Sequence, residues 1–288
     1  MKNLFAPFYL GLACSCLHLQ VHAQEFKEHI SKEIALTKEA ANTTILIYNL
    51  SGFIKVEGYS GDKVVLEIDK TISADDKESL ELGKKEFKMG LDQTPDSITA
   101  YIAEPYDSRP HSHRYDRYNN RDIQYEYHLD FTVKVPFAVN LHVSTVNDGD
   151  VVVKNVTGSL HVDNVNGAIA ISGAKGTTHA HTVNGNVEIS YLSNPSGHSS
   201  YYTVNGEIKV IYPANLSADL QFKSMNGEFF TDFPNAEVLP AKATKNQETK
   251  GGVTIYKLDK MTSVRIGSGA NDLKFETLNG NIYIKKQS

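Results

Sequence analysis

Histidines in the middle of the chain recur at a nearly regular spacing. His142, His161 and His179 are separated by 19 and 18 residues, and Asp163 and His181 each stand two places after one of them. If these segments are strands stacked side by side in register, the three imidazoles form a ladder with rungs about 4.8 Å apart. Neutral imidazoles at that spacing can share a divalent transition metal, with Asp163 as an oxygen ligand or as a hydrogen-bonding neighbour of a ligand.

A less specific interpretation stays open, in which the face is solvated and its histidines are incidental, because unequal intervals leave the register of the strands uncertain. The sequence therefore assigns no metal-binding residues and marks one candidate surface-binding face: His142, His161, Asp163, His179, His181 and Tyr202. If the ladder forms, its crowding opposes protonation of all three imidazoles. We then expect any ligand bound there to be lost as the pH falls towards about 5.

The segments that would position these side chains belong to a repeat. Six times an alternating run is followed by Asn-Gly or a near variant and then by a second alternating strand, as in HTVNGNVEI and YTVNGEIKV. The asparagines, which we interpret as a structural turn ladder, are Asn147, Asn166, Asn184, Asn205, Asn226 and Asn279. A period of about twenty residues is typical of a repeat architecture, and here each repeat supplies two short strands with a corner between them.

The residue before each asparagine distinguishes two folds. It is always apolar: Val146, Val165, Val183, Val204, Met225 and Leu278. In a meander of hairpins, for which Asn-Gly is the strongest short signal, this column faces solvent. At the corner of a stacked coil it points inward, and the asparagine side chains can bond to one another along the stack. The pattern favours the second fold, an all-β solenoid in which residues 138–233 form parallel coils with Val165, Val183 and Val204 inside.

Two segments interrupt the repeat. Residues 74–86 are rich in Lys and Glu and predict a short helix, and residues 89–103 predict a hairpin. Residues 104–122 are polar, rich in Arg, His and Tyr, and lack apolar periodicity, which indicates a loop. A solvated insertion is the simpler interpretation of this loop, and binding of an anionic glycan or of a metal ion is the alternative. The sequence thus predicts one domain over residues 24–288 with an insertion at about 71–122.

The first 23 residues have the composition of a signal peptide. Lys2 precedes an apolar stretch over residues 4–19, and Val21-His22-Ala23 stands where a signal peptidase would cut. We expect the mature protein to begin at Gln24 and to be exported to the periplasm, the cell surface or the medium. Gly11-Leu12-Ala13-Cys14 is a partial lipobox whose Leu is one place too close to the Cys, so lipoprotein anchoring through Cys14 is the less favoured alternative.

Cysteine usage and charge narrow the class of protein further. Cys14 and Cys16 both lie in the predicted signal peptide, so the mature chain is expected to have no disulfide. No later segment is long and apolar enough to be a transmembrane segment. The formal net charge is −5, and loss of Lys2 makes it more negative, which disfavours a nucleic-acid partner.

Carboxylates of the repeat are the residues that an enzyme of the β-helix class would use. A polysaccharide lyase or hydrolase needs clustered carboxylates on one exposed face. Glu188, Glu207 and Glu228 occupy outward positions, but Lys209 among them indicates a mixed solvated face. The sequence also lacks a Gly-x-Ser-x-Gly elbow, a His-Glu-x-x-His pair and a phosphate loop. We therefore expect no catalytic residues, no cofactor and no enzymatic activity.

Three stretches carry a resemblance to a known family: NLSGFIKVEGYSGDKVVLEI, VPFAVNLHVSTVNDGDVVVKNVTGSLHVDNVNGAIAISG and FETLNGNIYIKK. They resemble the bacterial putative adhesin family, exported β-solenoid domains of unknown biochemical function. The resemblance implies a single-stranded, right-handed parallel β-solenoid at the cell envelope and implies no catalytic residues. It points to a non-catalytic binding or structural module whose partner is an unidentified glycan or protein. A carbohydrate-active β-helix enzyme is the alternative, and an envelope sensor or scaffold is a third possibility.

Overall fold

The computed structural model describes residues 24–110, 123–234, 236–250 and 253–288. The predicted signal peptide, residues 1–23, lies outside the described residues. So do residues 111–122, which make up most of the polar loop expected at 104–122.

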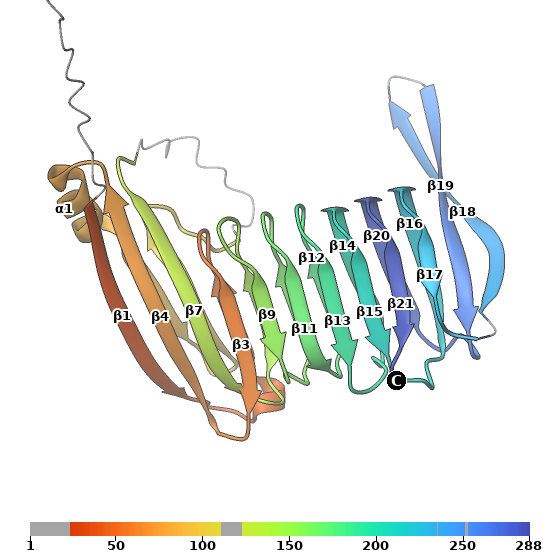
Figure 1. The fold of residues 1–288 in the computed structure, drawn as a ribbon, viewed down its shortest axis with the longest axis horizontal. Helices are drawn as coiled ribbons and strands as arrows, with labels where there is room; N and C mark the ends of the chain where they lie inside the picture. The colour runs from red at the N-terminus through yellow and green to blue at the C-terminus, as the bar shows by residue number, and fades with distance from the viewer. Residues whose placement is uncertain (1–23, 111–122, 235, 251–252) are drawn as a thin grey trace, which may run out of the picture.

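Two large β-sheets extend along the molecule and face each other (Figure 1). Sheet A has ten strands in the order β1 (Gln24–Ala35), β4 (Lys63–Ala74), β7 (Glu126–Pro136), β3 (Ile54–Tyr59), β9 (Val151–Lys154), β11 (Ile169–Ala174), β13 (Val187–Tyr191), β15 (Ile208–Tyr212), β21 (Ile282–Lys286) and β17 (Phe229–Thr231). Sheet B has eleven strands in the order β18 (Glu237–Lys250), β19 (Val253–Ile266), β16 (Ala218–Asn226), β20 (Asp272–Asn279), β14 (Ser199–Asn205), β12 (Thr178–His181), β10 (Leu160–Asp163), β8 (Asn140–Ser144), β2 (Thr44–Tyr48), β6 (Ser97–Glu104) and β5 (Lys88–Gln93).

The middle of the molecule consists of parallel coils. From β8 to β15 the chain alternates between the sheets, and each strand pairs in parallel with the strand of the next coil. The last coil, β20 and β21, does not follow this order. It lies between β14 and β16 in sheet B and between β15 and β17 in sheet A.

Both ends of sheet B and one end of sheet A are antiparallel. In sheet A, β4 pairs antiparallel with β1 and with β7, whereas β17 at the other end pairs in parallel with β21. In sheet B, β5 pairs antiparallel with β6, and β19 pairs antiparallel with β16 and with β18. The all-β prediction is therefore confirmed, but the chain forms two mixed sheets and is not built from parallel coils throughout. The expected helix and hairpin are present as α1 (Lys77–Glu86), which contacts β1 and β4, and as β5 with β6. A single 3-10 turn, η1 (Ala40–Asn42), precedes β2.

The core lies between the sheets and follows the alternation of the strands. In each coil the apolar positions point inward, for example Leu160 and Val162 of β10 and Ile169 and Ile171 of β11, all at most 3% exposed. Burying one such side chain contributes roughly 1.5–3 kcal/mol relative to leaving it in water. Among the described residues, no helix has the length and apolar character needed to cross a bilayer.

The column before each asparagine faces solvent, so the prediction that Val165, Val183 and Val204 pack inside is wrong. Val183 is 37% exposed and Met225 is 72% exposed. The buried residue is the one before it, such as Thr182 or Thr203, and the Thr182 hydroxyl donates to the carbonyl of Gly167 at 2.8 Å. A buried carbonyl needs a hydrogen-bond donor, so the small polar side chain turns inward at the corner and the valine next to it turns outward.

The six asparagines lie in one ladder along this corner. Each bond runs from a side-chain amide nitrogen to the amide oxygen of the neighbouring asparagine: Asn166 to Asn147, Asn184 to Asn166, Asn205 to Asn184, Asn279 to Asn205 and Asn226 to Asn279, all at 2.7–2.8 Å. Asn279 stands between Asn205 and Asn226, because the last coil is inserted there. The coils are therefore held in register by side chains as well as by backbone pairing.

The glycine that directly follows five of the six asparagines is required by close stacking of the coils. A Cβ atom placed on Gly206 would lie 2.1 Å from the carbonyl oxygen of Gly185, and one on Gly167 would lie 2.2 Å from the carbonyl oxygen of Gly149. Real Cβ atoms do not come so close to backbone oxygens. In this chain the Asn-Gly pair therefore marks a stacked corner, although the same pair is a strong hairpin signal elsewhere.

Three tyrosines bring hydroxyl groups into the core at one end of the parallel coils. The Tyr201 hydroxyl lies 2.7 Å from the Tyr191 hydroxyl and 2.9 Å from the Tyr212 hydroxyl, and all three side chains are at most 1% exposed. The Tyr191 and Tyr212 rings are stacked with centroids 5.0 Å apart. Burial raises the pKa of Tyr191, and it raises the pKa values of Tyr201 and Tyr212 well above their usual range.

We expect Tyr201→Phe to lower the free energy of unfolding at neutral pH by about 1–2 kcal/mol, because two buried hydroxyls lose their partner. A phenol with a raised pKa stabilises the fold fully below the unfolded-state pKa of about 10, and that contribution is lost as the pH rises further. The stability difference between wild type and variant should therefore narrow above about pH 10. Urea unfolding followed by circular dichroism between neutral and alkaline pH measures both effects. A gap that stays constant with pH would contradict the assignment.

Candidate functional site

The outward side chains of four neighbouring parallel strands form a single surface, which we call the histidine face. Strands β8, β10, β12 and β14 supply it, and it consists of His142, His161, Asp163, His179, His181, Ser200 and Tyr202. In-register pairing places His142 beside His161, His161 beside His179 and His179 beside Ser200. The same pairing places Asp163 beside His181 and His181 beside Tyr202. Because their neighbours in the strands are buried, these side chains point to solvent.

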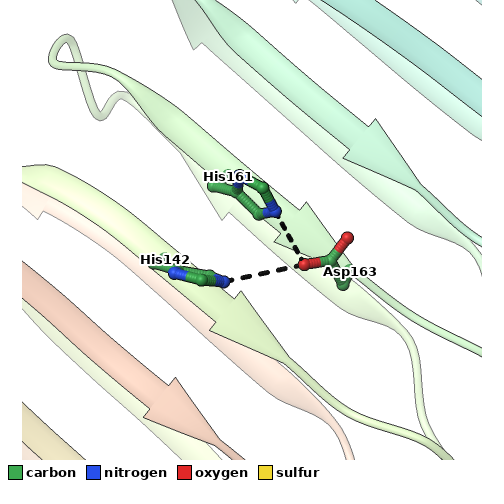
Figure 2. Close-up of side chains that lie close together, drawn as sticks. All are labelled: His142, His161 and Asp163. Carbon is green, nitrogen blue, oxygen red and sulfur yellow. Dashed lines mark ion pairs between the residues drawn. The ribbon is translucent and has the colours of Figure 1, made fainter. Parts of the chain in front are cut away.

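Asp163 is the centre of this face (Figure 2). Its Oδ2 atom lies 2.9 Å from Nε2 of His161 and 3.7 Å from Nε2 of His142, and its Oδ1 atom lies 3.7 Å from Nδ1 of His181. The three ligand atoms of His142, His161 and Asp163 all lie within 4.8 Å of one another. The side chains are 31%, 44% and 36% exposed, respectively, so solvent and solutes can reach them.

A second group of contacts surrounds Ser200. Its hydroxyl lies 2.8 Å from Nδ1 of His179 and 3.0 Å from Nε2 of His181. His181 therefore contacts Asp163 with one ring nitrogen and Ser200 with the other. Tyr202 stands at the edge of the group, with its ring centroid 6.1 Å from that of His181 and nearly perpendicular to it. The structure thus brings all six residues of the predicted face together on sheet B.

The electrostatics of the face are dominated by the carboxylate. Burial by itself raises the pKa of Asp163, but contacts with His142 and His161 and the charges of His161 and His181 outweigh it and hold that pKa well below its usual range. The hydrogen bond to Asp163 raises the pKa of His161. Desolvation lowers the pKa values of His179 and His181, and charge on His161 lowers both further. The face therefore presents an anionic carboxylate among imidazoles of differing proton affinity.

Two residues of the site were not singled out from the sequence. The Tyr48 ring stands edge-on to His142 with centroids 5.4 Å apart, and His198 lies 6.1 Å from His179 by the same measure. Tyr48 occupies the register position of Ser144, because β2 pairs in parallel with β8. Residues 45–56 are an early variant of the repeat with Ser51-Gly52 in place of Asn-Gly, and aligning them with the other copies would have placed Tyr48 on the face. His198 stands just outside the repeat, so the period gives no signal for it.

The other two candidate groups from the sequence, the polar loop and the carboxylates of sheet A, make ion pairs with nearby residues. Arg109, the described basic residue of the polar loop, pairs with Asp107 and Asp92, and its guanidinium lies 3.9 Å from the centroid of the Tyr101 ring. On sheet A, Glu188 lies 3.6 Å from the amine of Lys209. This pair fits the mixed solvated face expected from the sequence.

Comparison with known proteins places the chain in a family. The sequence of residues 138–285, slightly more than half of the chain, matches the Toastrack DUF4097 family. None of the curated proteins compared with the chain matches it.

Solved structures similar to this chain include a "putative cell adhesion protein" from Clostridium sporogenes, 11% identical, with 91% of this chain and 100% of that chain covered and a TM-score of 0.41. A "putative adhesin" from Bacteroides fragilis is 12% identical, with 90% and 97% covered and a TM-score of 0.40. A "putative lipid binding protein" from Parabacteroides distasonis is 9% identical, with 91% and 97% covered and a TM-score of 0.28. These scores are low, so the assignment rests on the sequence match: the chain belongs to the Toastrack DUF4097 family.

Proposed function

We propose that this protein is an exported, non-catalytic binding module of the cell envelope and that the histidine face is its ligand-binding surface. The observation that carries the proposal is the in-register arrangement of imidazole, carboxylate, hydroxyl and phenol groups on β8, β10, β12 and β14. Such a surface offers many hydrogen-bond donors and acceptors to a polar ligand, and a tyrosine at its edge adds apolar contact area.

The cellular setting is part of the same proposal. Export rests on the signal-peptide composition of residues 1–23, and adhesion to a glycan or protein is the role that the sequence resemblance implies. A single-stranded, right-handed winding of the parallel coils also comes from that resemblance.

The absence of catalysis is proposed from the carboxylates of sheet A. A glycosidase needs an acid and a base, or a nucleophile, held a few ångströms apart across a substrate. The Glu188 carboxylate instead faces the Lys209 amine, and the Glu207 carboxylate lies 3.5 Å from the Tyr283 hydroxyl. These pairings support a solvated polar surface and give no reason to expect turnover of a polysaccharide.

Binding to arrays of glycans and extracellular-matrix proteins tests the proposal. We expect the purified protein, from Gln24 onward, to bind at least one class of immobilised ligand. The double variant His179→Ala/Tyr202→Ala should weaken that binding by at least about tenfold, since a few residues, with tyrosine enriched among them, carry most of the energy of a binding surface and each costs more than about 1 kcal/mol when truncated.

The matched control is Glu188→Ala/Lys209→Ala, which removes two exposed polar side chains from the other sheet. We expect this variant to bind as the wild type does. Equal losses in both double variants, or binding to none of the arrays, would rule out the histidine face as the ligand-binding surface. Release of new reducing ends from an acidic glycan would show instead that the protein is an enzyme.

A further inference from the structure

We propose that His142, His161 and Asp163 form a binding site for a divalent transition metal ion of the zinc and nickel class. The ion would be held by Nε2 of each histidine and by Oδ2 of the aspartate, and its remaining positions would face solvent. Binding of the ion follows from the geometry alone, whereas its role as part of a ligand-binding surface rests on the proposed function.

The separations of the ligand atoms match a metal site. Zinc bonds to histidine nitrogen and carboxylate oxygen are about 2.0–2.2 Å long, so two ligands of a tetrahedral ion stand roughly 3.3–3.6 Å apart. The distances from Asp163 Oδ2 are 2.9 Å to His161 Nε2 and 3.7 Å to His142 Nε2, one on either side of that range. Side-chain rotations of a few tenths of an ångström would bring each of these two pairs to coordination distance, and the two histidine nitrogens lie within 4.8 Å of each other.

The backbone already holds the three side chains in the right relative positions. His142 and His161 are direct partners in the parallel pairing of β8 with β10, and Asp163 follows His161 on the same face of the same strand. The two imidazole rings are 4.3 Å apart between centroids. Both strands are interior strands of sheet B, so a neighbouring strand holds each of them on either side.

Neighbouring groups can orient the ligands from outside. Nδ1 of His181 lies 3.7 Å from the second oxygen of Asp163, and Nε2 of His181 lies 3.0 Å from the Ser200 hydroxyl. His181 is thus held by Ser200 and lies within ion-pair distance of the carboxylate, and loss of such an outer partner of a ligand commonly lowers metal affinity by 10- to 100-fold. On the other side of the site, the Tyr48 ring stands edge-on to His142.

The donor set indicates the class of metal. Imidazole nitrogens suit zinc, nickel, copper and iron, whereas calcium and magnesium prefer all-oxygen sites. Two histidines and one carboxylate leave at least one position open to a water molecule or to an oxygen of a bound ligand. The partial exposure of all three side chains keeps that position accessible.

Calorimetric titration with zinc chloride at pH 7.5 tests the site. We expect one ion per chain, with His142→Ala, His161→Ala and Asp163→Ala each weakening binding by at least about tenfold. The control is His29→Ala, because His29 makes similar contacts to Glu67 at 2.9 Å and Asp69 at 2.7 Å on sheet A. Retained affinity in the first three variants, or loss in the control alone, would overturn the proposal, as would the absence of binding.

Cobalt substitution separates ligands from orienting groups. The visible absorption of bound cobalt reports the atoms that coordinate it, so we expect His161→Ala to alter or abolish the spectrum. We expect His181→Ala to leave the spectrum in place while the ion binds more weakly. A spectrum unchanged by His161→Ala would show that the ion lies elsewhere.

Repeating the glycan and matrix arrays with a chelator distinguishes failure of this inference from failure of the proposed function. If the ion bridges the ligand, binding to the arrays should fall by at least about tenfold with the chelator and return when zinc is restored. Array binding that resists the chelator in a protein that binds no zinc would leave the proposed function standing and remove the metal site. Zinc binding by a protein that recognises no array would support the metal site and contradict the proposed function.

Discussion

Val187→Asp should strongly destabilise the stack of coils, whereas Val183→Asp, four residues earlier, should be tolerated. Val187 is fully buried between the sheets, and Val183 is 37% exposed at the corner. An unpaired carboxylate in the core lowers the free energy of unfolding by about 4 kcal/mol or more, against a typical total stability of 5–15 kcal/mol. A surface substitution such as Val183→Asp should change it by less than about 1 kcal/mol.

Urea unfolding of both variants, followed by circular dichroism, measures the contrast. The pair is matched, since each variant replaces a valine by an aspartate in the same coil. Similar large losses in both would mean that Val183 is buried in solution and that the corner turns as the sequence interpretation proposed. Small losses in both would mean that β13 is not a core strand.

Gly206→Ala should strongly destabilise the parallel coils. The added Cβ atom would lie 2.1 Å from the carbonyl oxygen of Gly185, and that oxygen belongs to the backbone of the next coil. Neither backbone can move without disturbing the ladder bond between Asn205 and Asn184. We expect the free energy of unfolding to fall by about 3 kcal/mol.

Gly197→Ala is the control, because there the nearest atom to the new Cβ is a side-chain methyl of Thr177 at 3.0 Å. That methyl group can rotate away, so the expected loss is less than about 1 kcal/mol. Thermal unfolding of both variants separates the two cases. A Gly206→Ala protein as stable as the wild type would show that the coils are further apart than the structure places them.

The register of the candidate site could be predicted because the repeat carries it. His142, His161 and His179 occupy the same position relative to Asn147, Asn166 and Asn184, and that shared offset outweighs the unequal intervals. The extra residue of the first interval, Asp148, lies at the corner after Asn147, and the extra residues of the interval from Asn184 to Asn205 lie in the loop between β13 and β14, so the strands keep their register. The distances between the Asp163 carboxylate and the nearby histidine nitrogens could not be predicted. They depend on side-chain rotamers, which the repeat pattern does not determine.

The outward orientation of the apolar residue before each asparagine could not be derived from hydrophobicity alone. Six apolar residues in one column predict a core, yet Val183, Met225 and Leu278 are 37%, 72% and 38% exposed. Thr182 and its equivalents take the inner position because they satisfy buried carbonyls. A hydrogen-bonding requirement therefore overrode the apolar signal at this point of the repeat.

The insertion of the last coil sets the order in which the chain can fold. During synthesis the parallel coils as far as β15 can assemble from contiguous sequence, because their neighbours emerge one after another. Strands β16 and β17 emerge next and carry the same repeat, but their native partners β20 and β21 are more than fifty residues away. The exposed edges of β14 and β15 must therefore stay free until the C-terminal strands arrive, and premature docking of β16 and β17 on those edges would trap the chain with its final coil excluded.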